Sequence, residues 1–288
     1  MAQTINTNIV SLNAQRNLNT SQSTLATSMQ RLSSGLRVNS AKDDAAGLAI
    51  AERMNTQVRG MNVAVRNAND GISMAQVGEG ALSNVSNIFQ RMRELAVQSA
   101  NGTNTPADRA SLNQEFVQLA QEATRTLGGT QFNGQNILAT TDTSVFQIGA
   151  NNDANIDQIT VGAFDWTGEA GLTALLGNTV ITGTNGPAMQ ITDIASAVGV
   201  LSTLDTAIDV ITSQRANFGA LQNRFENVVS NLMTAAENQT AARSRIMDAD
   251  YAAETAAMSR AQILQQAGNA MVAQANQLPQ QVLSLLQR

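Results

Sequence analysis

The most regular pattern of apolar positions lies in the last third of the chain, over about residues 201–268. One set of large apolar residues recurs every seven positions, and a second set fills the alternate steps of three and four. The two sets are Leu204, Ile211, Phe218, Phe225 and Leu232, and Leu201, Ile208, Leu221 and Val228. This spacing predicts a long helix whose narrow apolar seam must pack against another helix. Because residues 220–267 contain no Gly or Pro, we expect this helix to continue unbroken to Gly268.

A second apolar seam with the same period predicts the partner helix, over about residues 45–100. Its members are Met54, Met61, Ala68, Ala75, Leu82, Phe89 and Ala96. Asn101 and Gly102 end the pattern. Four glycines lie inside it, and each predicts a bend or a closely packed neighbour. They are Gly60, Gly71, Gly78 and Gly80.

A third, shorter helix is predicted after this break. Thr105 is suited to the N-cap, Pro106 to the first helical position and Asp108 to the third. Apolar residues then face one side as far as Gly128 and Gly129, namely Leu112, Phe116, Leu119 and Ala123. We expect this helix to return antiparallel to the second.

The two ends of the chain are amphipathic but almost uncharged. Residues 5–36 carry apolar side chains at Ile5, Ile9 and Leu12, and residues 261–287 carry no charge at all. In the latter segment Leu264, Met271, Leu278 and Leu285 fall seven apart. Since exposed helices usually carry charge, we expect these surfaces to become covered. The alternative is a pair of disordered tails, because amides, Ser and Thr also favour disorder.

Shorter signals lie in the connections. Ser40 and Asp43 have the spacing of a helix N-cap, and Lys42, the only lysine, suggests either a subunit contact or a local salt bridge. Asn133-Gly134 predicts a tight turn. Two alternating segments, residues 144–149 and 157–161, predict a β-hairpin around the Asn151-Asn152-Asp153 turn.

Composition supports thin helices and excludes several classes of chemistry. Only 3% of the 288 residues are aromatic and 14% are charged, so a bulky globular core is not expected. The absence of Cys excludes disulfides and thiolate chemistry, and the absence of His removes the commonest general base. A net charge of -5 without a basic cluster argues against a nucleic-acid binder. We also expect no secretory signal at the N-terminus and no apolar run long enough to span a bilayer.

No catalytic, cofactor or metal site is predicted. Asp153, Asp157 and Asp165 lack the spacing and the closing Glu of a calcium loop, so solvated turn residues are the better interpretation. We find no phosphate-binding loop, nucleophile motif or carboxylate pair. The sequence therefore gives no support to an enzyme.

Several long segments, in order, resemble those of bacterial flagellins. In the N-terminal part these are residues 1–8 (MAQTINTN), 31–47 (RLSSGLRVNSAKDDAAG), 66–73 (RNANDGIS), 90–101 (QRMRELAVQSAN) and 131–134 (QFNG). In the C-terminal part they are residues 242–246 (ARSRI), 258–268 (MSRAQILQQAG) and 273–286 (AQANQLPQQVLSLL). The resemblance covers about residues 1–165 and 200–288.

The resemblance implies a mainly α fold, in which long antiparallel helices from both chain ends form a coiled-coil bundle around a small β-hairpin region. It implies an inner-tube domain of residues 1–44 with 249–288. An outer-tube domain would comprise residues 45–168 with 199–248, including a hairpin near 140–165. Residues 169–198 would form a short exposed loop in place of the large outer domains of many flagellins.

The resemblance also implies a function and partners. Flagellins polymerise into the extracellular filament that drives swimming, after export in unfolded form through the flagellar type III apparatus. The expected partners are other copies of the chain, an export chaperone at the C-terminal helices, and the filament cap and hook–filament junction proteins. The family's contact region for Toll-like receptor five corresponds to Gln90, Arg91, Leu95 and Glu115. Neither a nucleic acid nor a membrane is an expected partner.

Two other functions remain open from the sequence. A hook–filament junction or adaptor protein built on the same helical ends would form a short ring of fixed number. A secreted enzyme grafted on such ends would need a folded middle domain, which about thirty residues are too few to form.

Overall fold

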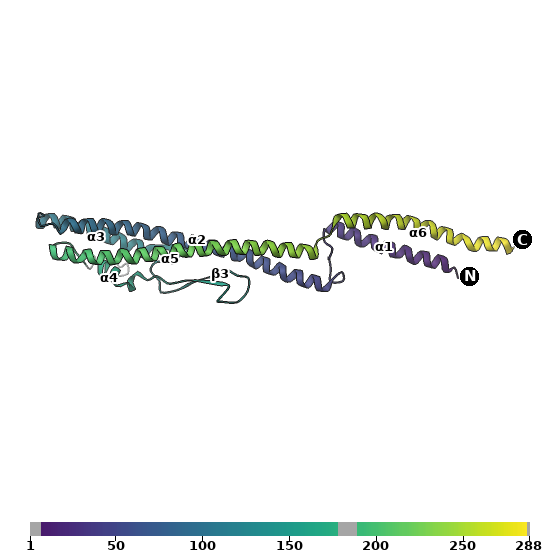
Figure 1. The fold of residues 1–288 in the computed structure, drawn as a ribbon, viewed down its shortest axis with the longest axis horizontal. Coiled ribbons are helices and arrows are strands. Elements are labelled where there is room, and N and C mark those ends of the chain that lie inside the picture. The colour runs from purple at the N-terminus through teal and green to yellow at the C-terminus, as the bar shows by residue number, and fades with distance from the viewer. Residues whose placement is uncertain (1–6, 178–188, 287–288) are drawn as a thin grey trace. The chain divides into compact units, whose positions relative to one another are not determined.

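The computed structural model describes residues 7–177 and 189–286, and the surroundings of side chains as far as Gln277. Its long helices are α1 (Ile9–Ser34), α2 (Ala45–Ser99), α3 (Pro106–Gly129), α5 (Ile194–Met247) and α6 (Tyr251–Leu286) (Figure 1). Shorter elements lie between α3 and α5: β1 (Gln131–Phe132), β2 (Gln135–Asn136), β3 (Ser144–Gln147), β4 (Gln158–Val161), the 3-10 turn η1 (Trp166–Gly168) and α4 (Ala170–Leu176). The predicted mainly α fold with a small β region is confirmed.

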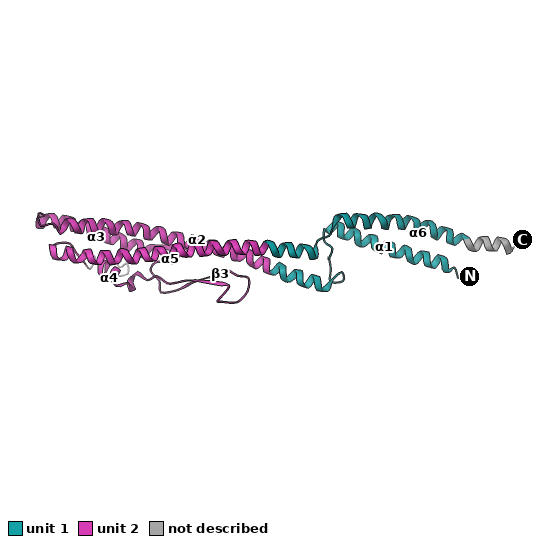
Figure 2. Ribbon diagram, in the orientation of Figure 1, with its two compact units in different colours: residues 1–56, 237–288 teal, residues 57–236 magenta. Residues whose placement is uncertain are grey.

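The chain divides into two compact units (Figure 2). The first comprises residues 1–56 and 237–288, and the second comprises residues 57–236. Both divisions fall inside a continuous helix, α2 or α5, rather than at the predicted domain boundaries of 44/45 and 248/249. The predicted boundaries concern shells of an assembled polymer, so they stay a prediction.

The core of the second unit is the seam between α2 and α5, which lie side by side and antiparallel (Figure 1). On α5 the seven-residue set is buried at Leu204, Ile211, Phe218 and Phe225. On α2 the matching set is buried from Met61 to Ala96. The two predicted seams therefore pack against each other, as a coiled-coil pattern requires.

Glycines on α2 make room for the phenyl rings of α5. A Cβ atom added at Gly71 would lie 2.7 Å from the ring of Phe225, and one at Gly78 would lie 2.9 Å from the ring of Phe218. At Gly60 the close neighbour is Ala150, 2.8 Å from such an atom. A Cβ atom added at Gly80 would have no such neighbour within 4 Å. Close neighbours are thus confirmed at three of the four predicted glycines.

The local signals of the third helix and the tight turn are also confirmed. Thr105 and Asp108 form a reciprocal capping box at the start of α3, with Pro106 at the first helical position. Asn133 (φ 50°) and Gly134 (φ 80°) both adopt the left-handed conformation that a two-residue β-hairpin turn requires. This turn joins the antiparallel strands β1 and β2.

The predicted hairpin is formed by β3 and β4, which pair antiparallel with Ser144 opposite Val161 and Gln147 opposite Gln158. Phe146 of β3 meets Phe225 of α5 edge to face, with ring centroids 5.5 Å apart. This contact attaches the hairpin to the helical core.

The predicted exposed loop over residues 169–198 is wrong for its described parts. Leu172 and Leu175 of α4 are fully buried, as is Ile191 after the segment 178–188, which lies outside the described residues. The i, i+3 spacing of these leucines places both on one face of a short helix, which a loop would not require. The long helix α5 also begins earlier than predicted, at Ile194, after Asp193 accepts a hydrogen bond from the N–H of Ser196 (2.9 Å).

The expected unbroken helix to Gly268 is wrong. Helix α5 ends at Met247, and α6 begins at Tyr251 after Asp250 accepts a hydrogen bond from the N–H of Ala252 (2.9 Å). Aspartate side chains that bind backbone N–H groups in this way start a new helix without Gly or Pro. The break is also held from outside, because the N–H of Ala249 donates to the carbonyl oxygen of Gly35 (2.9 Å).

The N-cap of α2 is not formed by the predicted residues. The carboxylate of Asp43 accepts hydrogen bonds from the N–H and Oγ of Ser40 and from the N–H of Asn39, which lowers the pKa of Asp43. The cap of α2 is instead Asp44, whose Oδ1 accepts from the N–H of Gly47 (2.8 Å). Ser40 and Asp43 therefore close a turn of their own. Among residues 7–177 and 189–277, no ion pair involves Lys42.

One described helix is, by length and composition, apolar enough to cross a membrane, which the sequence analysis did not expect. An 18-residue stretch of α5 has a mean hydropathy of 1.6. The seam of α5 packs on α2 at Leu204, Ile211 and Phe218. Packing in the core buries 28% of the residues of this stretch.

The glycine contacts predict opposite effects of one substitution at different sites. Gly71→Ala and Gly78→Ala should each lower the free energy of unfolding by about 1–3 kcal/mol, because Phe225 or Phe218 must move. Gly80→Ala should instead raise it by up to about 1 kcal/mol, because alanine favours the helix and meets no neighbour. Urea unfolding followed by the fluorescence of Trp166, the only tryptophan, measures all three. Equal effects at the three sites would contradict the packing described.

The capping box predicts a pH dependence. Hydrogen bonds from the side chain and the N–H of Thr105 lower the pKa of Asp108 in the folded protein. Its stabilising effect is therefore present above the unfolded pKa of about 3.9 and is lost as the pH falls through the lower folded pKa. Asp108→Asn should be less stable than the parent at pH 7, and the difference should shrink towards pH 2.5. A difference that stays constant over this range would refute the assignment.

Candidate assembly and recognition surfaces

Helices α1 and α6 of the first unit meet through small and polar side chains. Ser11, Ser28, Ala261 and Ala275 are buried between them. Ser11 Oγ donates to Asn276 Oδ1 (2.8 Å), and Asn8 Nδ2 donates to the carbonyl oxygen of Ala275 (2.7 Å). Small residues of this kind let the helix backbones approach closely.

Leu18 of α1 packs against Gly268 of α6, but several other large apolar side chains of these two helices point away from that contact. Ile9 is 67% exposed and Met271 is 59% exposed, and Leu12 and Leu264 are exposed to a similar extent. Ile5 lies outside the described residues, as do the side chains of Leu278 and Leu285. Within the described residues, Ile9–Ser34 and Tyr251–Leu286 are helical rather than structureless. Their apolar residues are therefore available to neighbouring molecules.

A charged surface joins α2 to α3. Arg91 donates from Nη1 to Glu94 Oε2 and from Nε to Glu115 Oε1, each at 2.9 Å. The carboxylates of Glu94 and Glu115 raise the pKa of Arg91. All three side chains and Gln90 are exposed, so this cluster contributes little to stability. It leaves Gln90, Arg91 and Glu115 together on one surface.

Leu95 does not belong to that surface. Its side chain is only 1% exposed and packs in the core of the second unit. Arg91 and Leu95 lie four positions apart and are therefore neighbours on α2, but Leu95 lies on the side turned to the core and Arg91 on the side turned to solvent. The side chain of Leu95 therefore offers no exposed surface to a receptor in this structure, and its receptor role stays a prediction.

Helix α2 also forms ion pairs with α5 that are not predicted from the sequence. Arg93 donates from Nε to Asp205 Oδ1 (2.8 Å), and Arg215 donates from Nη2 to Glu79 Oε1 (2.8 Å). Beside Arg93 lies an open pocket of about 540 Å³ that Val97 also lines. These ion pairs join residues more than 100 positions apart, which no local pattern reveals.

A buried arginine organises the end of the second unit. Arg109 is 8% exposed and donates from Nε to the carbonyl oxygen of Ser99 (2.9 Å) and from Nη2 to that of Asn101 (3.0 Å). Ser99 Oγ in turn donates to the carbonyl oxygen of Ile191 (2.6 Å). A cation in the first turn of a helix opposes the helix dipole, and this local conflict is the only sequence signal of its role.

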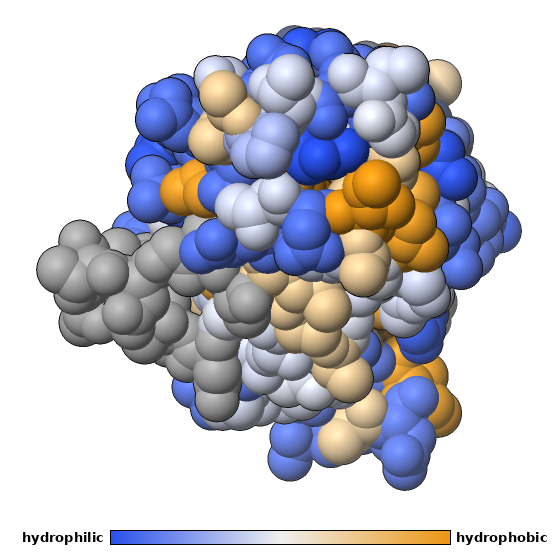
Figure 3. Space-filling model, turned by 90° about the vertical axis from the view of Figure 1, so that its left-hand side faces the viewer, coloured by the Kyte–Doolittle hydropathy of each residue, from blue (hydrophilic) through white to orange (hydrophobic). Residues whose placement is uncertain are grey.

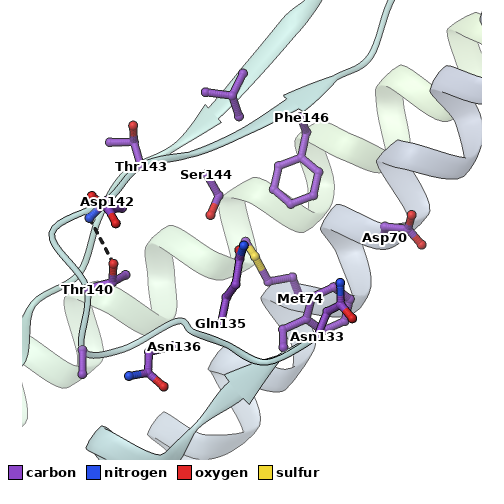
Figure 4. A pocket seen from close by; sticks show the side chains of 13 residues that line it. Asp70, Met74, Asn133, Gln135, Asn136, Thr140, Asp142, Thr143, Ser144 and Phe146 are labelled. Carbon is purple, nitrogen blue, oxygen red and sulfur yellow. Dashed lines mark hydrogen bonds between the residues drawn. The ribbon is translucent and has the colours of Figure 1, made fainter.

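A polar pocket of about 980 Å³ lies beside α2 and the two hairpins (Figure 4). Asp142 and Asp70 stand at opposite ends of the view, with Met74, Gln135 and Asn133 between them. Phe146 of β3 also lines the pocket. Among the described residues, no group of three or more His, Cys, Asp or Glu side chains could hold a metal ion.

The surface seen from the end where α2 and α3 meet is mostly hydrophilic or intermediate (Figure 3). Apolar side chains appear there in separate small patches. This distribution differs from that of α1 and α6, where charge is scarce and large apolar residues are exposed.

Comparison with known proteins gives consistent matches at both ends of the chain. Residues 5–143 match the family described as the bacterial flagellin N-terminal helical region, and residues 201–286 match the C-terminal helical region. The chain is 46% identical over 283 residues to a flagellin of Halalkalibacterium halodurans, covering 98% of this chain and 99% of that protein. It is 36% identical over 376 residues to flagellin D of Vibrio cholerae serotype O1, covering 99% and 100% of the two chains.

A solved structure shares the fold at low sequence identity. It is that of a putative flagellar hook-associated protein from Vibrio parahaemolyticus, with a TM-score of 0.57 and 13% identity. The match covers 72% of this chain and 100% of the other. At this identity the likeness concerns the fold alone.

Replacement by Ala should lower the free energy of unfolding by different amounts at the buried Arg109 and at the exposed Arg91. Arg109→Ala should lower the free energy of unfolding by about 2–4 kcal/mol, because the buried carbonyl oxygen of Ser99 and the part-buried one of Asn101 lose a charged donor. Arg109→Lys should be intermediate, since a lysine lacks the forked geometry that reaches both oxygens. Arg91→Ala should cost less than about 1 kcal/mol, because its ion pairs are exposed. Urea unfolding measures the three values, and a cost at Arg91 equal to that at Arg109 would contradict this account.

Proposed function

Because this chain belongs to the bacterial flagellin family, we propose that it is a structural subunit that polymerises with copies of itself into the flagellar filament for swimming. The observation that carries the proposal is the surface of α1 and α6. These helices contact each other through small polar residues and expose Ile9, Leu12, Leu264 and Met271. Such side chains favour burial by further copies.

The tube organisation and the export route are part of the same proposal. Residues 1–44 with 249–288 form the inner tube, and residues 45–168 with 199–248 form the outer tube. The chain is exported unfolded through the flagellar type III apparatus, and an export chaperone holds the C-terminal helices before export. The filament cap and the hook–filament junction proteins are further partners, and the assembled protein is extracellular. The resemblance of the terminal segments to flagellins supports these assignments.

Recognition by Toll-like receptor five is proposed for the exposed surface that contains Gln90, Arg91 and Glu115. The hydrogen bond from Arg91 to Glu115 holds two of these side chains together. Leu95 acts from beneath, by holding α2 in the core. We assign no enzymatic activity, cofactor, metal or nucleic-acid partner to this chain.

The exposed apolar residues predict a selective loss of assembly. Replacing Leu12, Leu264 and Met271 together by Ser should leave the urea unfolding of the monomer unchanged within about 0.5 kcal/mol, because these side chains are exposed in the single chain. The same variant should fail to form filaments when seeded with sheared parent filaments. Sedimentation and electron microscopy measure the polymer. Normal filaments from this variant would exclude the proposed inner-tube packing.

Electron microscopy of the parent protein also separates the proposal from its alternative. Long polymers with open ends are expected for a filament subunit. A short ring of fixed number would instead identify a hook–filament junction or adaptor protein.

A further inference from the structure

The tip of the β3–β4 hairpin exposes an isoleucine. Ile156 is 73% exposed, more than any other large apolar side chain in residues 7–177 and 189–277. Its neighbours at the tip, Asn151, Asn152 and Asn155, are exposed amides. A large apolar side chain surrounded by hydrogen-bonding groups has the composition of an interface anchor with a polar rim.

The backbone of the tip is tightly organised. The N–H of Ile156 and the N–H of Asp157 both donate to the carbonyl oxygen of Asp153, at 3.2 and 2.7 Å. The side-chain Oδ1 of Asp153 accepts from the N–H of Asn155 (3.0 Å). Gln147 Nε2 donates to the carbonyl oxygen of Asn151 (2.8 Å). Ile156 is thus presented by an ordered turn, which lowers the entropy lost when it binds.

The hairpin is also fixed to the helical core. Asn67 Nδ2 of α2 donates to the carbonyl oxygen of Gln147 (2.9 Å). Ala150 packs against Gly60 of α2, where a Cβ atom would collide with it. Phe146 meets Phe225 edge to face. The tip therefore projects Ile156 from a rigid base and leaves most of its side chain exposed within the described residues.

The same unit contains a hollow of suitable chemistry. The pocket of about 980 Å³ combines apolar side chains of Met74, Phe132 and Phe146 with the amides of Gln135 and Asn136. Apolar surface can accept the isoleucine, and the amides can pair with the asparagines of the tip. No hydrogen bond within the described residues engages the side chain of Gln135 or Asn136, so both remain available.

We infer that the hairpin tip of one copy docks, through Ile156, into this pocket on the second unit of a neighbouring copy. The inference rests on the proposed function as a homopolymer subunit. Tip and pocket are two different surfaces of one chain, so their contact is heterologous and leaves a free tip and a free pocket at the two ends of every oligomer. Contacts of this kind propagate into open helical polymers.

Charges at this contact set its response to salt. Asp70 and Asp142 line the pocket, and Asp153 lies on the tip. These like charges repel weakly across the contact, although Asp153 is turned to the backbone of its own tip. Added salt screens the repulsion, so the contact strengthens as ionic strength rises.

A matched pair of substitutions tests the anchor. Ile156→Ala should raise the monomer concentration that remains at polymerisation equilibrium about tenfold or more, because one buried isoleucine is lost at every contact. Val198→Ala, at another exposed apolar residue of the second unit, should change it less than about threefold. Both variants should unfold in urea like the parent, as followed by Trp166 fluorescence. Equal effects of the two substitutions on polymerisation would overturn the inference.

Cross-linking tests the pairing of the two surfaces directly, because the chain contains no cysteine. Filaments of the double variant Ile156→Cys, Gln135→Cys should give a ladder of covalent oligomers on oxidation. Either single variant alone should give no ladder, and a mixture of the two should give dimers. The control pair Ile156→Cys, Val198→Cys should give no ladder.

The outcomes separate this inference from the proposed function. If the parent forms no filaments, the proposed function fails. If the parent polymerises while Ile156→Ala polymerises equally well, or while the tip and pocket cysteines give no ladder, the docking of the tip alone is refuted. Filaments, a specific defect of Ile156→Ala and a ladder limited to the tip–pocket pair together support the inference.

Discussion

The antiparallel contact between α2 and α5 is the constraint on which the rest of the second unit depends. Each helix carries an apolar residue at every seventh position, and neither seam can remain in water. Gly71 and Gly78 receive the rings of Phe225 and Phe218, and these rings allow one alignment of the two helices. Once that alignment is set, the capping box places α3 beside α2, and Arg109 closes the turn between them. The hairpin then packs on the same two helices through Ala150 and Phe146.

The helices of the first unit pack against each other in a different way. Helices α1 and α6 meet mainly through serine, alanine and asparagine, with Leu18 against Gly268, and they leave several large apolar side chains exposed. Such a pair of helices buries only part of its apolar surface within one chain. The second unit therefore contains most of the buried core of the monomer. The first unit leaves apolar surface exposed, which neighbouring copies would cover in the proposed filament. This division between folding and assembly fits a subunit that must remain separate before it polymerises.

The exposed surfaces of the second unit are held by contacts beneath them. Arg91 and Glu115 stand on α2 and α3, whose spacing depends on the buried Phe116 and Leu95. Ile156 stands on a turn closed by Asp153 and supported by Asn67. Apolar packing fixes the backbone in the first place and hydrogen bonds fix it in the second, and in both the exposed residue contributes little to the stability of the monomer.

The sequence by itself determined the features that depend on residues close in the chain. The seven-residue repeat of apolar positions predicted α2 and the apolar seam of α5. The Thr105–Asp108 pair predicted the start of α3, and Asn133-Gly134 predicted the turn between β1 and β2. Only the tertiary structure decided features that depend on distant partners. Asp250 starts a new helix where Ala249 binds Gly35, Leu95 lies in the core, and Arg109 reaches the end of another helix. Burial and hydrogen bonding across the fold depend on which elements meet, and a local pattern of residues does not contain that information.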